Sequence, residues 1–230
     1  MRIKINFKPS TVEIPAKEII NLTKSYLHRI IGNNNDYHGK PSNYAITPLM
    51  RGKYNKDNKS YSFPYGTYIV FSTLDNNLMD IIFSNIYKVK FDNNLQFFGI
   101  DIIEEKFTNG NNYVTTLSPI LLRNNKELTY LDKEDFENIL TEKTIKKLKY
   151  ANQNLNTENL SIKLTYDDSY NKINIIPVNN IPNKTSQCNL VINTNKKVME
   201  TLYNIGLGIS TGCGFGTFYN TINYKYYNIK

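Results

Sequence analysis

Two histidines, His28 and His38, are the side chains of this sequence best suited to exchanging protons near neutral pH. An imidazole has an ordinary pKa of about 6.5, so it can act as a general acid or a general base under physiological conditions. Lys40 lies two residues after His38 and would bring an ammonium group near it. Taken alone, however, a histidine in a polar loop is more often a solvated surface residue.

A predicted helix positions the first histidine, and the loop after that helix positions the second. Apolar residues recur at helical spacing over residues 15–31, and His28 falls on the polar side of this pattern. Gly32 and a run of asparagines end the helix. The following loop carries His38 directly into a short strand that we expect within residues 43–49.

A glycine-rich segment near the end of the chain is a second candidate site. Five of the eleven glycines fall between Gly206 and Gly216, after a predicted helix that Thr194 or Asn195 would cap. Strand-like alternation follows over residues 215–219. A dinucleotide fingerprint needs its glycines after a strand and before a helix, so this order excludes it. The segment either lets a phosphate or base approach its backbone or forms a bulged hairpin that needs glycine only for its turns.

Composition and charge narrow the class of partner. The 230 residues, 40% of them hydrophobic, suffice for one large or two modest domains. A formal charge of +8 favours a polyanionic partner. The 18 tyrosines and 11 phenylalanines suit base stacking as well as core packing. Because no run of about 18 apolar residues and no signal peptide is present, we expect a cytoplasmic protein without membrane attachment.

The cysteines and acidic residues give no sign of a metal or cofactor. Cys188 and Cys213 are too few for a disulfide framework and lack zinc-site spacing. The aspartates are scattered along the chain. We therefore expect neither a metal nor a cofactor.

The order of predicted elements is that of a ferredoxin-like domain, present twice. The first half gives strand, helix, strand, strand, helix and strand over residues 2–7, 15–31, 43–49, 66–73, 76–87 and 95–107. The second half repeats this outline over residues 119–123, 132–152, 161–166, 172–177 and 189–194, with a polar, proline-containing link before the last of these and the glycine-rich segment after it. We predict an α+β protein of tandem ferredoxin-like (RRM-like) βαββαβ domains, spanning residues 1–117 and 118–230.

Three separated features occur together in one known family. They are the glycine pattern of residues 206–216, the run Leu-Ser-Pro-Ile-Leu-Leu-Arg at 117–123, and a histidine before the stretch 43–49. In these features the chain resembles the CRISPR-associated repeat-processing endoribonucleases of the Cas6 family, over nearly its whole length. Related repeat-associated subunits share the glycine loop, so this loop indicates the superfamily more strongly than the activity.

The resemblance implies an activity that needs no cofactor. The protein would bind CRISPR repeat RNA and cut the precursor crRNA without a metal, because the RNA supplies its own 2′-OH nucleophile. The products would carry a 2′,3′-cyclic phosphate and a 5′-hydroxyl. Other CRISPR effector subunits and a second copy of the chain are further candidate partners.

The resemblance also suggests catalytic residues. It places the catalytic histidine at His38, with His28 as the alternative. Lys40 is the candidate cation for the scissile phosphate. Tyr26 is a candidate donor to the phosphate or the 2′-OH, although its neighbours at helical spacing favour core packing.

Candidate RNA-binding residues come from the glycine loop and from basic side chains. The loop glycines would let RNA approach, and two hydroxyls would donate hydrogen bonds. A basic helix face in the second half would follow a phosphate backbone, unless it is only a solvated surface. The full set is Gly206, Gly208, Ser210, Thr211, Gly212, Gly214, Gly216, Arg51, Lys53, Lys143, Lys146 and Lys147.

Two other functions compete with repeat cleavage. The first is an RNA-binding structural subunit of a CRISPR effector complex that does not cut. The second is a small-molecule enzyme on the same fold, which would require an acidic or metal site. The scattered aspartates argue against this second alternative.

Overall fold

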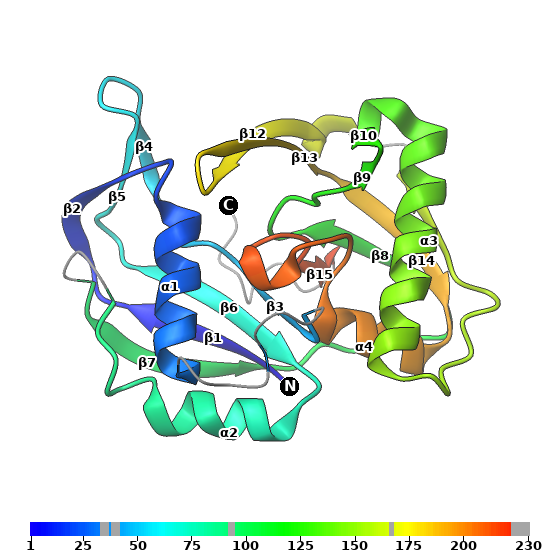
Figure 1. Ribbon diagram of the computed structural model, residues 1–230, viewed down its shortest axis with the longest axis horizontal. Coiled ribbons are helices and arrows are strands. Elements are labelled where there is room, and N and C mark those ends of the chain that lie inside the picture. Colours follow the sequence, from blue (N-terminus) through cyan, green and yellow to red (C-terminus); the bar gives the residue numbers. More distant parts are fainter. Residues whose placement is uncertain (33–36, 38–41, 92–94, 166–167, 222–230) are drawn as a thin grey trace.

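The computed structural model describes residues 1–32, 37, 42–91, 95–165 and 168–221 (Figure 1). Two α+β halves lie side by side, with α1 and α2 in one and α3 and α4 in the other. None of the helices within these residues is long and apolar enough to cross a membrane.

The N-terminal half is built on a four-stranded antiparallel sheet of order β3-β6-β1-β7. Its elements are β1 (Arg2–Phe7), α1 (Ile19–Ile31), β3 (Tyr44–Ile46), β6 (Thr67–Thr73), α2 (Asn76–Asn85) and β7 (Phe97–Ile103). All seven residues of β6 are buried, which explains its nearly continuous apolar sequence. Asp75 caps α2 by accepting a hydrogen bond from the Leu78 amide. The βαββαβ order and this strand arrangement confirm the expected ferredoxin-like fold.

A smaller sheet of order β2-β5-β4 is added to this half. Its strands are β2 (Ser10–Pro15), β4 (Lys53–Asn55) and β5 (Ser60–Phe63). We expected a helix from Pro15, but the helix begins at Ile19. Residues Ser10–Pro15 are extended, with only Ile14 fully buried, and residues 16–18 form a turn before the helix.

The C-terminal half repeats the same topology with the sheet order β11-β14-β8-β15. Its elements are β8 (Gly110–Thr116), α3 (Lys133–Ala151), β11 (Ser161–Leu164), β14 (Asn189–Thr194), α4 (Lys196–Ile205) and β15 (Phe218–Asn220). Asn195 caps α4 by accepting from the Val198 amide at 2.9 Å. Strand β8 pairs with β14 and β15, so the two main sheets divide between Ile103 and Gly110.

Residues 119–123, which we expected to form the first strand of this half, make only isolated bridges. Ile120 bridges Ser186, and Leu121 bridges Ile209. The remaining short elements are β9 (Arg123–Asn124), β10 (Lys126–Glu127), η1 (Tyr130–Asp132), η2 (Asp168–Tyr170) and η3 (Thr211–Cys213).

The polar link that we expected between residues 177 and 189 forms a second strand instead and makes a hairpin with the strand before it. Strand β12 (Lys172–Val178) pairs with β13 (Ile181–Gln187) along its whole length. Asn179 and Asn180 form the turn with φ of 49° and 66°. Positive φ at both central residues is the requirement of a type I′ turn, and asparagine tolerates it.

The two halves are joined by buried contacts. Arg2, only 1% exposed, donates to the backbone oxygens of Tyr203 and Phe218, and its guanidinium carbon lies 3.4 Å from the centroid of the Tyr203 ring. Apolar residues from both halves, including Ile20, Leu121 and Phe215, form a further cluster. The site described next lies at this junction.

Candidate functional site

The glycine-rich segment is a closed loop held by backbone hydrogen bonds. Helix α4 ends where the Gly206 amide donates to Leu202 O at 2.8 Å. The Leu207 amide then donates to Gly216 O at 2.8 Å and closes the loop. The Ile209 amide donates to Leu121 O at 3.1 Å and ties the loop to the segment that precedes β9.

The loop glycines are required for packing. A Cβ on Gly216 would lie 1.8 Å from Leu207 O, and one on Gly208 would lie 2.7 Å from Leu121 O. A Cβ on Gly212 would lie 2.5 Å from the Ser42 hydroxyl oxygen. All five loop glycines are buried, and all except Gly212 have positive φ. The structure therefore supports the turn-and-packing interpretation of these glycines, because their backbone is not presented to solvent.

The loop exposes little of its surface. Ser210 is exposed and has a left-handed φ of 57°, whereas Thr211 is 1% exposed. The Thr211 hydroxyl donates to Tyr44 O at 2.9 Å. Of the two hydroxyls expected to contact RNA, only that of Ser210 lies at the surface.

Lys147 does not extend from α3 into solvent but holds the glycine loop. Its ammonium donates to Ile205 O at 2.5 Å, to Thr211 Oγ1 at 2.7 Å and more distantly to Gly206 O at 3.4 Å. These carbonyls end α4, where the helix dipole favours a cation. Part of the side chain is exposed, but burial of the ammonium lowers the pKa of Lys147 to about 7.

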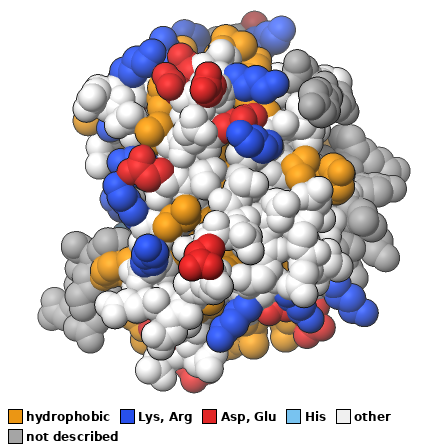
Figure 2. Space-filling model, turned by 90° about the vertical axis from the view of Figure 1, so that its right-hand side faces the viewer, with side chains coloured by type: hydrophobic (Ala, Val, Ile, Leu, Met, Phe, Trp, Pro, Cys, Tyr) orange, Lys and Arg blue, Asp and Glu red, His pale blue; other side chains and the backbone are white. Residues whose placement is uncertain are grey.

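The other basic residues of α3 do not form an uninterrupted positive face. Lys146 is exposed and pairs with Glu142, and Lys143 is half-buried. The side of the molecule that includes α3 carries basic and acidic side chains interspersed (Figure 2). Lys143 and Lys146 thus lie on a mixed surface, which weakens the case that they follow a phosphate backbone.

The glycine loop packs against the part of the chain that follows the candidate catalytic segment. Gly212 lies against Ser42 and the ring of Tyr44, at the start of β3. Burial raises the pKa of the Tyr44 hydroxyl. On the other side of the segment, the Tyr37 hydroxyl donates to Asp75 Oδ2 at 2.8 Å. His38 and Lys40 themselves lie outside the described residues.

Helix α1 contacts the glycine loop near the start of the helix. Ile20 packs with Phe215 of the glycine loop. Lys24 and His28 follow Ile20 at intervals of four residues, so they continue the same side of the helix away from the loop. Both are half-buried.

Tyr26 is a core residue. It is 0% exposed and packs on Phe7 and Phe91, with ring centroids 5.7 Å and 4.9 Å away. Its hydroxyl lies 3.5 Å from Ile86 O, and burial raises its pKa. Its expected role as a donor to the phosphate does not fit this position, because the hydroxyl does not reach the surface.

Arg51 and Lys53, the remaining basic candidates, are exposed; Lys53 begins β4 and Arg51 lies two residues before it. The φ of Arg51 is 66°, a value that residues other than glycine rarely adopt. Within the described parts of the chain, no three His, Cys, Asp or Glu side chains are grouped as metal ligands.

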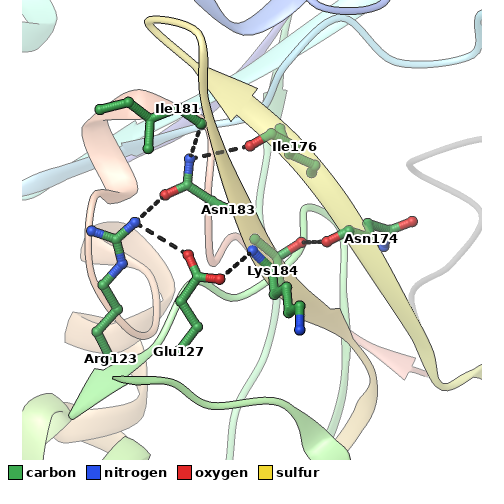
Figure 3. Close-up of polar contacts among 8 residues, drawn as sticks. Arg123, Glu127, Asn174, Ile176, Ile181, Asn183 and Lys184 are labelled. Atoms are coloured by element: carbon green, nitrogen blue, oxygen red, sulfur yellow. Dashed lines mark hydrogen bonds and ion pairs between the residues drawn. The ribbon is translucent and has the colours of Figure 1, made fainter. Parts of the chain in front are cut away.

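The β12–β13 hairpin, which the sequence did not reveal, is held by side chains close to its turn (Figure 3). Arg123 contacts Glu127 Oε1 at 3.3 Å and donates to the side-chain oxygen of Asn183. Asn183 donates to Ile181 O at 2.7 Å and to Ile176 O at 3.2 Å. The hairpin is therefore fixed to β9 and β10 and contributes a firm wall to the junction.

Solved structures share this fold along almost the entire chain. A Cas6-related protein from Pyrococcus furiosus is 18% identical with a TM-score of 0.79, covering 97% of this chain and 99% of that one. A RAMP protein described as binding different RNA substrates is 18% identical with a TM-score of 0.77, covering 96% and 99%. A Cas6 product complex is 10% identical with a TM-score of 0.62, covering 95% and 98%.

Sequence comparison gives the family. The chain matches none of the curated proteins with which it was compared. The family model described as CRISPR associated protein Cas6, C-terminal, matches residues 102–219, just over half of the chain. The chain therefore belongs to the Cas6 family of CRISPR-associated proteins, as the glycine pattern and the 117–123 run indicated.

Proposed function

We propose that this protein is a metal-independent endoribonuclease that binds CRISPR repeat RNA and cuts the precursor crRNA. The observation that carries the proposal is the junction at the glycine loop. There, Gly212 packs on Ser42 and Tyr44, which follow the segment containing His38, and α1, the helix that carries His28, packs on the loop through Ile20. Family membership and the charge of +8 support an RNA substrate.

The chemistry needs few protein groups. The 2′-oxygen attacks the adjacent phosphorus, the bond from phosphorus to the 5′-oxygen breaks, and the 2′-proton passes to a base while the 5′-oxygen gains one. An imidazole can take or give these protons, and a nearby cation stabilises the charge on phosphorus. We assign the proton transfer to His38, with His28 as the alternative, and the cation to Lys40.

Other residues hold this site in place. Lys147 and the glycines hold the loop against β3, and holding the RNA in line for attack requires such a fixed surface. Ser210 is the loop's exposed hydroxyl and the proposed donor to the RNA backbone. The neighbours described as binding RNA substrates and as a product complex share the fold and are consistent with this use of it.

The alternative function is a structural RNA-binding subunit that does not cut. A cleavage assay with repeat RNA in EDTA distinguishes this subunit from the endoribonuclease. We expect the purified protein to cut a repeat RNA from the CRISPR array of its own genome without added metal. The upstream product should carry a 2′,3′-cyclic phosphate, detectable by mass spectrometry. Tight binding with intact RNA would instead support the subunit.

A further inference from the structure

A cavity of about 790 Å³ lies between the N-terminal half and the β12–β13 hairpin. The β4–β5 hairpin and the β12–β13 hairpin stand on either side of it (Figure 1). Its apolar lining includes Ile19, Leu49, Ile175 and Pro177. This volume falls in the range of sites that hold a small organic group.

Two tyrosines give the cavity an aromatic surface. The rings of Tyr54 and Tyr61 lie 4.9 Å apart between centroids, and both line the cavity. Tyr54 is 45% exposed. Tyr61 sits directly on Gly52, where a Cβ would lie 2.7 Å from its ring. An exposed ring backed by a second, seated ring is suited to stacking with a planar base.

The charged residues of the lining are all cationic. They are Lys17, Arg51 and Lys59, and each is exposed. The lining contains no aspartate or glutamate. Arg51 and Lys59 also hold left-handed backbone, with φ of 66° and 51°. Three cations and no carboxylate give the lining a positive charge, which suits an anionic ligand.

An amide on β12 adds an unused donor. The Asn174 side-chain nitrogen is buried without a hydrogen-bond partner within the described part of the chain, and Asn174 lines the cavity. The Asn174 backbone oxygen is already engaged, since it accepts from the Thr185 hydroxyl at 3.0 Å (Figure 3). A ligand with an acceptor on its edge would satisfy the free amide.

The cavity is separated from the glycine loop by one layer of side chains. Ile20 and Pro48 line it. A Cβ on Gly214 would lie 3.5 Å from Pro48 and 3.8 Å from Ile20, on the loop side of the same residues. The cavity and the glycine loop are therefore neighbours on opposite sides of these two residues.

We propose that this cavity binds an unpaired nucleotide of the RNA, outside the bond that is cut. The base stacks on Tyr54 and Tyr61 and faces Ile175 on the opposite wall. The flanking phosphates contact Arg51 and Lys59. The inference rests on the proposed function, because it assumes an RNA substrate. Stacking and charge together select a single-stranded nucleotide over a purely apolar ligand.

The test uses labelled repeat RNA and a 12-nucleotide oligouridine, with dissociation constants measured for the full chain. Tyr54→Ala should weaken binding of both RNAs about tenfold, the effect of losing one stacked base. Arg51→Gly with Lys59→Gly should also weaken binding about tenfold and lower the salt dependence by about 1 to 2 in log–log slope. Glycine suits the positive φ at both positions, so this variant should fold normally.

The matched control removes two exposed lysines outside the cavity, as Lys56→Ala with Lys90→Ala. If they bind as tightly as the control while the parent binds and cuts, the cavity proposal is overturned and the proposed function stands. If the parent neither binds nor cuts repeat RNA, the proposed function fails and the cavity proposal fails with it.

Discussion

The two halves share one fold but contribute differently to the junction between them. The C-terminal half supplies a buried glycine loop that Lys147 and backbone hydrogen bonds hold in place. The N-terminal half supplies the histidines, on α1 and on the segment before β3. The glycine loop, the most conspicuous feature of the sequence, therefore holds the two halves together, whereas the proposed chemistry belongs to the N-terminal half.

Removing a histidine of the N-terminal half should have the largest effect on cleavage. His38→Ala should slow single-turnover cleavage by about 10²- to 10⁴-fold, because the general acid–base group is lost. RNA affinity should change little. His28→Ala, measured beside it, should retain most of the activity. The reverse ranking would transfer the catalytic role to His28, and parental activity in both variants would remove the histidines from the mechanism.

Adding one methyl group to the glycine loop should destabilise the protein. Gly216→Ala should lower the free energy of unfolding by about 3 kcal/mol, since the Cβ meets Leu207 O and φ is 67°. The matched control is Gly99→Ala, where a Cβ has no neighbour within 4 Å. Its effect should stay within about 0.5 kcal/mol. Chemical denaturation measures both, and equal stabilities would contradict the packing role of the loop.

The buried lysine should make stability depend on pH. The pKa of Lys147 is about 7 in the folded protein, below the ordinary lysine value of 10.5. Between these values the unfolded chain binds one more proton, so folding stability should rise with pH from 7 to 9. Relative to Lys147→Met, the parent should gain up to about 1.4 kcal/mol per pH unit.

Lys146→Met is the matched control for this titration. Lys146 is exposed and pairs with Glu142 on the same helix. The difference in unfolding free energy between the parent and this variant should not change comparably with pH over the same range. If the difference in unfolding free energy between the parent and Lys147→Met is also independent of pH, the Lys147 ammonium titrates normally.

Tyr26 should give the smallest effect. Because its hydroxyl faces only Ile86 O within the core, Tyr26→Phe should leave the cleavage rate within about twofold. A loss of 10²-fold or more with unchanged stability would return Tyr26 to the catalytic site and contradict its assignment to the core.

Local sequence pattern was enough for most of the fold but not for β8 and β13. Periods of 3.6 and 2 indicated the first βαββαβ unit and most of the second, but the opening strand of the second was expected at residues 119–123 instead of Gly110–Thr116. Strand β13 was missed because Pro182 and the polar residues after it do not resemble a buried strand. The adjacent Asn179 and Asn180, which suit a type I′ turn, are the signal that predicts this hairpin.

The contacts of the site were harder to predict because they join distant residues. Ser42 and Leu121 leave no room for a Cβ at Gly212 and Gly208, and neither contact can be deduced from the loop's own sequence. Lys147 follows Lys146 directly, and only the position of α4 distinguishes the buried ammonium from the exposed one.

A single 2′-deoxy substitution at the nucleotide before the cut tests whether the RNA supplies the nucleophile. We expect the deoxy repeat RNA to bind with the affinity of the all-ribose RNA and to remain uncut, because the nucleophile is missing. Cleavage of the deoxy RNA at the same bond would contradict attack by the 2′-OH.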